Sequence, residues 1–172
     1  RGAPRRYPQA GAIVDIGGQD SKVICLDGEG NVTNFVMNDK CAAGTGRFLE
    51  LMARTLELEM DEMAAIGLSW EQELTISSMC TVFAESEVVS LIADNHSAAD
   101  IVHGLNQSVA GKTAGAKGPY VMTGGVARNR GVVKALEERL GAPLWIAPDP
   151  DLCGALGAAL FALDSLDSTA RT

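Results

Sequence analysis

Two short apolar runs, each closed by a pair of glycines, constrain the fold of this 172-residue chain most strongly. Residues 12–16 (AIVDI) lead into the Gly-Gly pair at 17–18, and residues 120–123 (YVMT) lead into the pair at 124–125. A short apolar run that ends in turn residues is typical of a buried strand. We therefore predict two buried strands, each ending in a tight turn that carries no side chain.

The remaining apolar patterns place further elements around these two strands. We expect strands at 22–26, 32–37 and 144–146, with a hairpin turn at 27–31. Helices are expected at about 45–58, 60–67 and 82–93, from 98 onward, from 130 onward and over 154–160. We also expect strand character up to Ile76, and a last helix whose small residues let it pack closely against a sheet.

This order of elements predicts an α/β domain with three layers. We place the domain at residues 11–164, with a linker or cut end at 1–10 and a tail at 165–172. The Ser97 hydroxyl is expected to cap the helix that follows it. Glycines at 111, 115 and 118 are expected to weaken the end of that helix.

Composition excludes several classes of function. A net charge of −8 and the lack of a basic stripe argue against binding to nucleic acid. No apolar run reaches the roughly 18 residues of a membrane span, and the first residues lack the apolar core of a secretory signal. The four cysteines (Cys25, Cys41, Cys80 and Cys153) are too far apart for a disulfide scaffold, so a reduced, cytoplasmic setting is expected.

The two glycine turns carry polar residues suited to binding phosphate. Asp15 ends the first strand, where a carboxylate could hold water on Mg²⁺ while backbone N–H groups of the turn bind phosphate. Asn129 follows the second turn, where it could both cap a helix and reach a ligand. Each turn alone is also compatible with an ordinary tight connection. Two such turns in one small domain favour a nucleotide cleft between them.

A decapeptide at 38–47 (NDKCAAGTGR) places Cys41 just before a helix. Unpaired N–H groups at a helix N-terminus favour a thiolate, which binds metal or attacks electrophiles. Gly44, Thr45 and Gly46 are expected to leave backbone N–H groups free for an anion such as phosphate. The plain alternative is a buried cysteine beside a glycine-rich helix start.

Cys80 has a similar setting, with Ser and Thr before an apolar helix. An iron–sulfur cubane needs four thiolates, so a two-fold dimer in which each chain gives Cys41 and Cys80 would complete it. A cluster within one chain that also uses Cys25 and Cys153, a shared zinc site, and two merely buried cysteines stay open as alternatives. His96 and His103 have no companion at ligand spacing, so both are expected on helix surfaces.

Five segments together closely resemble the activator ATPases of 2-hydroxyacyl-CoA dehydratases and the ATPase subunits of benzoyl-CoA reductases. They are residues 15–22, 38–48, 77–88, 123–129 and 154–160. The resemblance implies the actin-like (ribonuclease H-like) ATPase fold. It also implies a homodimer with one [4Fe–4S] cluster held by Cys41 and Cys80 of each chain. ATP would drive transfer of single low-potential electrons from a ferredoxin or flavodoxin to a dehydratase or reductase partner.

The resemblance also implies nucleotide contacts, with Asp15 as the catalytic residue beside Mg²⁺. The implied contacts are Asp15, Gly17, Gly18, Gln19, Ala43, Gly124, Gly125, Arg128, Asn129 and Asp151. Family members carry a further phosphate loop in an N-terminal half, so we expect this chain to match the C-terminal half of the two-lobed fold. A small-molecule kinase of the same superfamily and a non-catalytic binding remnant are the alternative functions.

Overall fold

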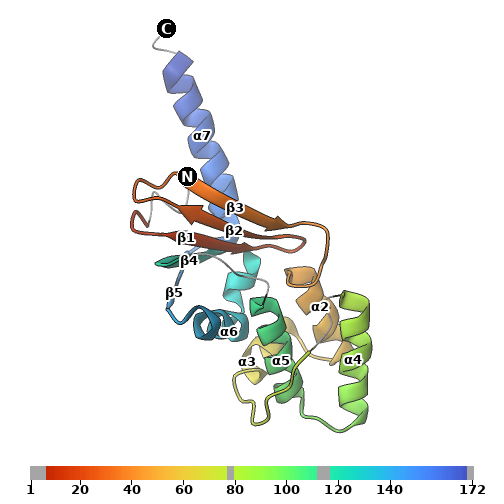
Figure 1. Cartoon of the computed structure of the whole chain (residues 1–172). Coiled ribbons are helices and arrows are strands. Elements are labelled where there is room, and N and C mark those ends of the chain that lie inside the picture. Colours follow the sequence, from red (N-terminus) through yellow and green to blue (C-terminus); the bar gives the residue numbers. More distant parts are fainter. Residues whose placement is uncertain (1–6, 77–79, 112–116, 170–172) are drawn as a thin grey trace.

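The computed structural model describes residues 7–76, 80–111 and 117–169 and is built on a five-stranded sheet (Figure 1). The strand order is β3-β2-β1-β4-β5. The strands are β1 (Ala12–Ile16), β2 (Ser21–Leu26), β3 (Val32–Asn38), β4 (Tyr120–Thr123) and β5 (Leu144–Ile146). The first three form an antiparallel meander, and β4 and β5 add in parallel on the other side of β1. The strands predicted at 12–16, 22–26, 32–37, 120–123 and 144–146 are therefore confirmed, and the two strands that end in Gly-Gly are direct neighbours.

A layer of helices covers one face of this sheet (Figure 1). The helices are α2 (Gly46–Thr55), α3 (Met60–Ile66), α4 (Thr81–Ala93), α5 (Ala98–Ala110) and α6 (Arg130–Leu140), with short 3-10 turns η1 (Gly125–Arg128) and η2 (Pro150–Leu152). Ser97 caps α5 as predicted, since its hydroxyl accepts a hydrogen bond from the Asp100 N–H at 3.1 Å. The sequence thus placed these elements to within a few residues of their ends.

The core lies between the sheet and the helical layer. Alternate residues of β1 (Ala12, Val14 and Ile16) point into it, as the two-residue period of a strand requires. They belong to one buried apolar cluster with Phe48 of α2 and Leu105 of α5, which are fully buried. The opposite face of the sheet has a much smaller apolar cluster. The helical layer therefore provides most of the burial that stabilises the fold.

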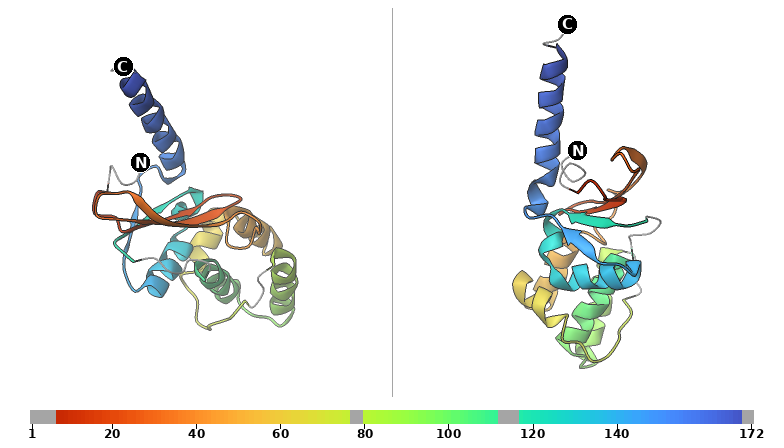
Figure 2. Two further views of the ribbon diagram at one scale, coloured as in Figure 1. Left: turned by 45° about the horizontal axis from the view of Figure 1, so that its top comes forward. Right: turned by 90° about the vertical axis from the view of Figure 1, so that its left-hand side faces the viewer.

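The last helix departs from the prediction. α7 (Cys153–Thr169) continues past the predicted end at 160 and rises away from the sheet on the side opposite the helical layer (Figure 2). Leu156, Phe161, Leu163 and Leu166 of this helix are exposed. Apolar residues surround α7 instead of forming one stripe, so no single face directs it onto the sheet. The expected close packing on the sheet was wrong.

Two further expectations were wrong. Residues 67–76 form no strand, because Asp100 holds this segment as a loop by accepting hydrogen bonds from the N–H groups of Glu71 and Gln72, each at 2.8 Å. His103 is buried instead of lying on a helix surface, and its ring stacks on Trp70 with centroids 4.0 Å apart. Both differences arise from packing between segments distant in sequence.

Some predictions lie outside the described residues. These are the linker before residue 7, the Ser-Ser-Met segment before Cys80, the glycine at 115 and the last residues of the tail. Among the helices that the structure describes, none has both the length and the apolar character needed to cross a bilayer.

Candidate functional site

The first glycine turn is hydrogen-bonded directly to the start of α2. The Gly17 N–H donates to the Asp20 carbonyl at 2.9 Å and closes the turn between β1 and β2. The carbonyls of Gly17 and Gly18 then accept the N–H groups of Gly46 and Arg47, both at 2.8 Å. The first turn of α2 therefore satisfies two of its unpaired N–H groups with the glycine turn.

This arrangement corrects one expectation about the cysteine segment. The Gly46 N–H is occupied by Gly17, and the Thr45 N–H donates to the Ala42 carbonyl at 3.0 Å. These two groups were expected to be free for an anion, and that expectation was wrong. The helix start serves to hold the glycine turn in place.

The second glycine turn packs against the end of β1. Gly124 has a φ of +84°, and a Cβ on it would lie 2.2 Å from the Ile16 carbonyl oxygen. Its N–H donates to the Pro150 carbonyl at 2.8 Å. Only glycine adopts this conformation at such close approach without strain. The two turns are therefore held backbone to backbone at one end of the sheet.

A cleft of about 320 Å³ opens between the two turns, α2 and α3. Five of the predicted nucleotide contacts lie on its walls, namely Gly17, Gly18, Gly125, Arg128 and Asn129. The remaining walls come from Gly46, which the sequence singled out only as a possible anion site, and from residues that it did not single out: Leu49, Glu50, Met60, Asp61, Ala64 and Val126. Gly18 and Gly125 face open space, since apart from their chain neighbours no described residue has an atom within 4 Å of where a Cβ would stand. The cleft is thus bounded by bare backbone on one side and by helices on the other.

Asp15, Gln19, Ala43, Gly124 and Asp151 do not line this cleft. Ala43 is buried in the core, whereas Gln19 is exposed on the turn. Gly124 supports the second turn from behind, as described above. Of the predicted contacts, only the five named before therefore face the cleft.

Asp15 is held at the end of β1 by a neighbouring hydroxyl and a lysine. Its Oδ2 accepts a hydrogen bond from Thr123 Oγ1 at 2.6 Å, and its Oδ1 lies 3.8 Å from Lys22 Nζ. Its side chain keeps about a quarter of its surface exposed, 25%. Carboxylates and water are the ligands that Mg²⁺ prefers. Asp15 therefore has the chemistry to hold a hydrated Mg²⁺ while its other contacts fix its orientation.

Arg128 and Asp151 form an ion pair beside the cleft. Arg128 Nη2 lies 2.6 Å from Asp151 Oδ1, and both side chains are largely exposed. This hydrogen bond from Arg128 holds the pKa of Asp151 below its ordinary value of 3.8. Asp151 thus orients the guanidinium, which is the group of this pair that lines the cleft.

Asn129 both caps a helix and lies on the cleft wall, as predicted. Its Oδ1 accepts the Val132 N–H at 3.1 Å at the start of α6. Its side chain is only 6% exposed, and its Nδ2 has no hydrogen-bond partner among the described residues. A buried donor without a partner is costly. The Asn129 amide nitrogen is therefore a buried donor at the cleft wall that no described residue satisfies.

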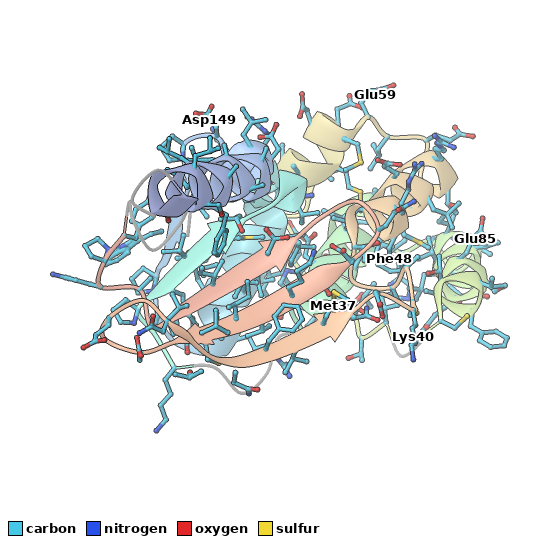
Figure 3. The ribbon with its side chains drawn as sticks, turned by 90° about the horizontal axis from the view of Figure 1, so that it is seen from above. Met37, Lys40, Phe48, Glu59, Glu85 and Asp149 are labelled. Carbon is cyan, nitrogen blue, oxygen red and sulfur yellow. The ribbon has the colours of Figure 1, made fainter. Side chains whose placement is uncertain are left out.

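The two cysteines of interest lie on segments that flank α2. Cys80 is exposed and occupies the N-cap position of α4. Cys41 is half-buried against the core, in a loop held by Asn38, whose Nδ2 donates to the carbonyls of Cys41 and Ala43 at 3.1 and 3.3 Å. α4 packs against α2, and Figure 3 shows the loop at Lys40 beside α4, which carries Glu85. The two cysteine segments therefore lie at the same side of the molecule.

Within the described ranges, no group of three or more His, Cys, Asp or Glu side chains is arranged to hold a metal ion. A four-thiolate cluster at Cys41 and Cys80 would need its other two ligands from a second chain. Thiols near a helix N-terminus have the right chemistry for such a ligand set. Both cysteines therefore carry the thiol group that such a site requires.

The mixed sheet, the two glycine turns and the cleft between them define this chain as a domain with the actin-like ATPase fold. MreB5 of Spiroplasma citri bound to AMPPNP shows the same fold, with a TM-score of 0.50 at 15% identity over 95% of this chain and 56% of that one.

The chain belongs to the BadF/BadG/BcrA/BcrD ATPase family, whose model matches residues 1–162. It is 50% identical to the activator of lactoyl-CoA dehydratase from Anaerotignum propionicum, over 92% of this chain and 63% of that protein. A solved activator of the 2-hydroxyisocaproyl-CoA dehydratase from Clostridium difficile with bound ADPNP has a TM-score of 0.90 at 46% identity, over 99% of this chain and 66% of that one. The chain thus spans about two thirds of the length of these relatives.

Proposed function

We propose that this chain is the nucleotide- and cluster-binding part of an ATP-dependent activator. It would transfer single electrons to a 2-hydroxyacyl-CoA dehydratase or a benzoyl-CoA reductase-type partner. The observation that carries this proposal is the pair of hydrogen bonds from Gly46 and Arg47 to the carbonyls of Gly17 and Gly18. They join the turn that bounds the cleft to the helix that follows the Cys41 loop. A ligand that moves the turn would therefore move the start of α2 and the Cys41 loop with it.

ATP would lie in the cleft between the two glycine turns. Gly18 and Gly125 leave room for phosphates to approach the backbone, and the Asn129 amide and the Arg128 guanidinium would donate to them. Leu49, Met60 and Val126 give the cleft an apolar wall suited to a flat ring. Asp15 would hold hydrated Mg²⁺ and orient the attacking water. The bound analogue in the similar solved activator supports this assignment.

The electron-transfer part of the proposal depends on Cys41 and Cys80. In a homodimer, these two residues of each chain would hold one [4Fe–4S] cluster, which supplies one-electron chemistry when bound. Cys80 is exposed at the N-terminus of α4, where the helix dipole would favour its thiolate. A ferredoxin or flavodoxin would be the electron donor, in reducing cytoplasm. The names of the similar activators support a dehydratase as the partner.

Iron content after anaerobic reconstitution tests the cluster ligands. Replacing Cys41→Ser or Cys80→Ser should remove most of the bound iron and the visible absorption of the cluster. The matched control is Cys153→Ser, since Cys153 is also a half-buried cysteine but lies at the start of α7. This control should keep its iron. Unchanged iron in both Cys41 and Cys80 variants would refute the shared site, and loss of iron in the control would favour a site within one chain.

ATP hydrolysis on the same anaerobic samples separates the alternative functions. An activator should hydrolyse ATP and contain iron. Hydrolysis or phosphoryl transfer to a small molecule without iron would instead indicate a kinase. Iron without hydrolysis would indicate a binding remnant, so each outcome assigns the chain to one class.

A further inference from the structure

A buried asparagine that no described residue hydrogen-bonds through its side chain lies on α5, which packs against α3 and α6. Asn106 is in the middle of α5 and is 1% exposed. Neither its Oδ1 nor its Nδ2 has a partner among the residues that the structure describes. Replacing a buried polar group by an apolar one of similar shape is often neutral or stabilising. An unpaired amide at this buried position therefore calls for a role beyond packing.

The side chain of Asn106 lies between the end of α3 and the first turn of α6. A Cβ on Gly67, at the end of α3, would lie 2.8 Å from Asn106 Nδ2, and a Cβ on Gly131, in the first turn of α6, would lie 2.3 Å from it. Both glycines thus make room for this amide. Met60, Asp61 and Ala64 of α3 and Asn129 at the start of α6 line the cleft. The position of Asn106 therefore sets the spacing between two walls of the cleft.

The Asn106 amide also lies close to that of Asn129. Asn129 Oδ1 is 3.3 Å from the point where a Cβ on Gly131 would stand, the same point that Asn106 Nδ2 approaches. Asn129 Oδ1 is already used to cap α6, which leaves its Nδ2 as the unpaired group. A side-chain amide nitrogen carries two N–H donors. One could serve a ligand and the other a protein acceptor. Asn106 Oδ1 belongs to the same amide group as the Nδ2 atom near Gly131, and it is a buried acceptor without a partner among the described residues.

We propose that Asn106 is a positioning residue for nucleotide binding. In the nucleotide-bound state its Oδ1 accepts one N–H of Asn129, which directs the second N–H of Asn129 into the cleft toward an acceptor oxygen of the nucleotide. Asn106 itself does not touch the ligand. This inference rests on the proposed function, because it assumes that the cleft binds ATP.

A double-mutant cycle on nucleotide affinity tests this inference. The variants are Asn106→Ala, Asn129→Ser and both together, titrated with a non-hydrolysable ATP analogue by calorimetry. Serine at 129 keeps a capping oxygen but removes the amide donor. Asn106→Ala should raise the Kd about tenfold, and the double variant should bind no more weakly than Asn129→Ser alone, because residues that act through one another are not additive. Circular dichroism melting confirms folding, and Asn106→Ser replaces the alanine variant if that does not fold.

Val109→Ala is the matched control, since Val109 is fully buried on the same helix. It should lower the melting temperature and leave the Kd unchanged. The inference is overturned if folded Asn106→Ala binds the analogue as tightly as the unchanged protein. It is also overturned if the effects of the two asparagine variants are additive, or if Val109→Ala weakens binding equally. Failure of the unchanged protein to bind the analogue would instead count against the proposed function.

Discussion

The two glycine pairs have the same sequence pattern but differ in what each glycine does. At Gly124 the backbone has a φ of +84°, and a Cβ would meet the Ile16 carbonyl oxygen at 2.2 Å. At Gly18 and Gly125 a Cβ would have no atom of a described residue within 4 Å, chain neighbours apart. The first position therefore needs glycine for the fold, and the other two keep an open surface. A glycine in such a turn can therefore be required by the backbone conformation or by the need for open space beside the backbone. Only the structure distinguishes these two cases.

The largest expected effect is on folding, at Gly124. Gly124→Ala should lower the free energy of unfolding by about 4 kcal/mol, because the new methyl group meets backbone and the conformation disfavours any side chain. Gly125→Ala, the next residue, should change it by only about 0.5 kcal/mol or less. Urea unfolding followed by circular dichroism measures both. Equal stabilities for the two variants would contradict this distinction between the glycines.

The next effect is on ligand binding, at the two open glycines. Gly18→Ala and Gly125→Ala should each raise the Kd for an ATP analogue about tenfold, which corresponds to ~1.4 kcal/mol, since a methyl group would occupy space for the phosphates. Gly154→Ala is the control, because its Cβ would also meet nothing within 4 Å but lies on α7. Calorimetric titration should show no change for this control. Tight binding by both cleft variants would show that the bare backbone is not used.

A smaller effect separates the two roles of Asn129 beside the second turn. Asn129→Ala should cost about 1 kcal/mol of stability through loss of the cap. Asn129→Ser should cost only a few tenths, because the hydroxyl can still accept the Val132 N–H. Both variants should bind the analogue more weakly than the unchanged protein, since both lack the amide donor. Restored binding in the serine variant would mean that Asn129 acts only as a cap.

The smallest effect is the pH dependence of the exposed Arg128–Asp151 pair. Because Arg128 lowers the pKa of Asp151 in the folded chain, the pair contributes stability above the ordinary value of 3.8, and this contribution is lost as the pH falls through the lowered pKa. An NMR titration of the Asp151 carboxyl group should show this lowered value. Arg128→Met should return it toward 3.8. The same pKa in both proteins would mean that Arg128 does not hold Asp151 in solution.

Much of the fold could be predicted because its signals are local. The apolar runs at 12–16 and 120–123 end in glycines, and each became a strand that ends in a turn. Asn129 is typical of a helix N-cap, and it caps α6. The five cleft residues that were predicted all belong to these two turns.

The rest of the site depends on contacts between distant segments, which no local pattern reports. The wall that α3 provides, with Met60 and Asp61, arises from helix packing around Asn106. The Arg128–Asp151 pair joins residues 23 positions apart. The buried stack of His103 on Trp70 was missed for the same reason. The apolar pattern of α7 correctly predicted a helix, but it has no single apolar face from which the position of the helix relative to the sheet could be predicted.

A nucleotide that binds between the two glycine turns should also change the environment of the backbone amides at the start of α2. The most direct test is an NMR titration of the 15N-labelled chain with ADP and Mg²⁺. The account predicts saturable shifts of the amide signals of Gly18, Gly125 and Asn129, together with those of Gly46 and Arg47, which are hydrogen-bonded to the first turn. Shifts confined to other surfaces, or none at saturating nucleotide, would contradict it.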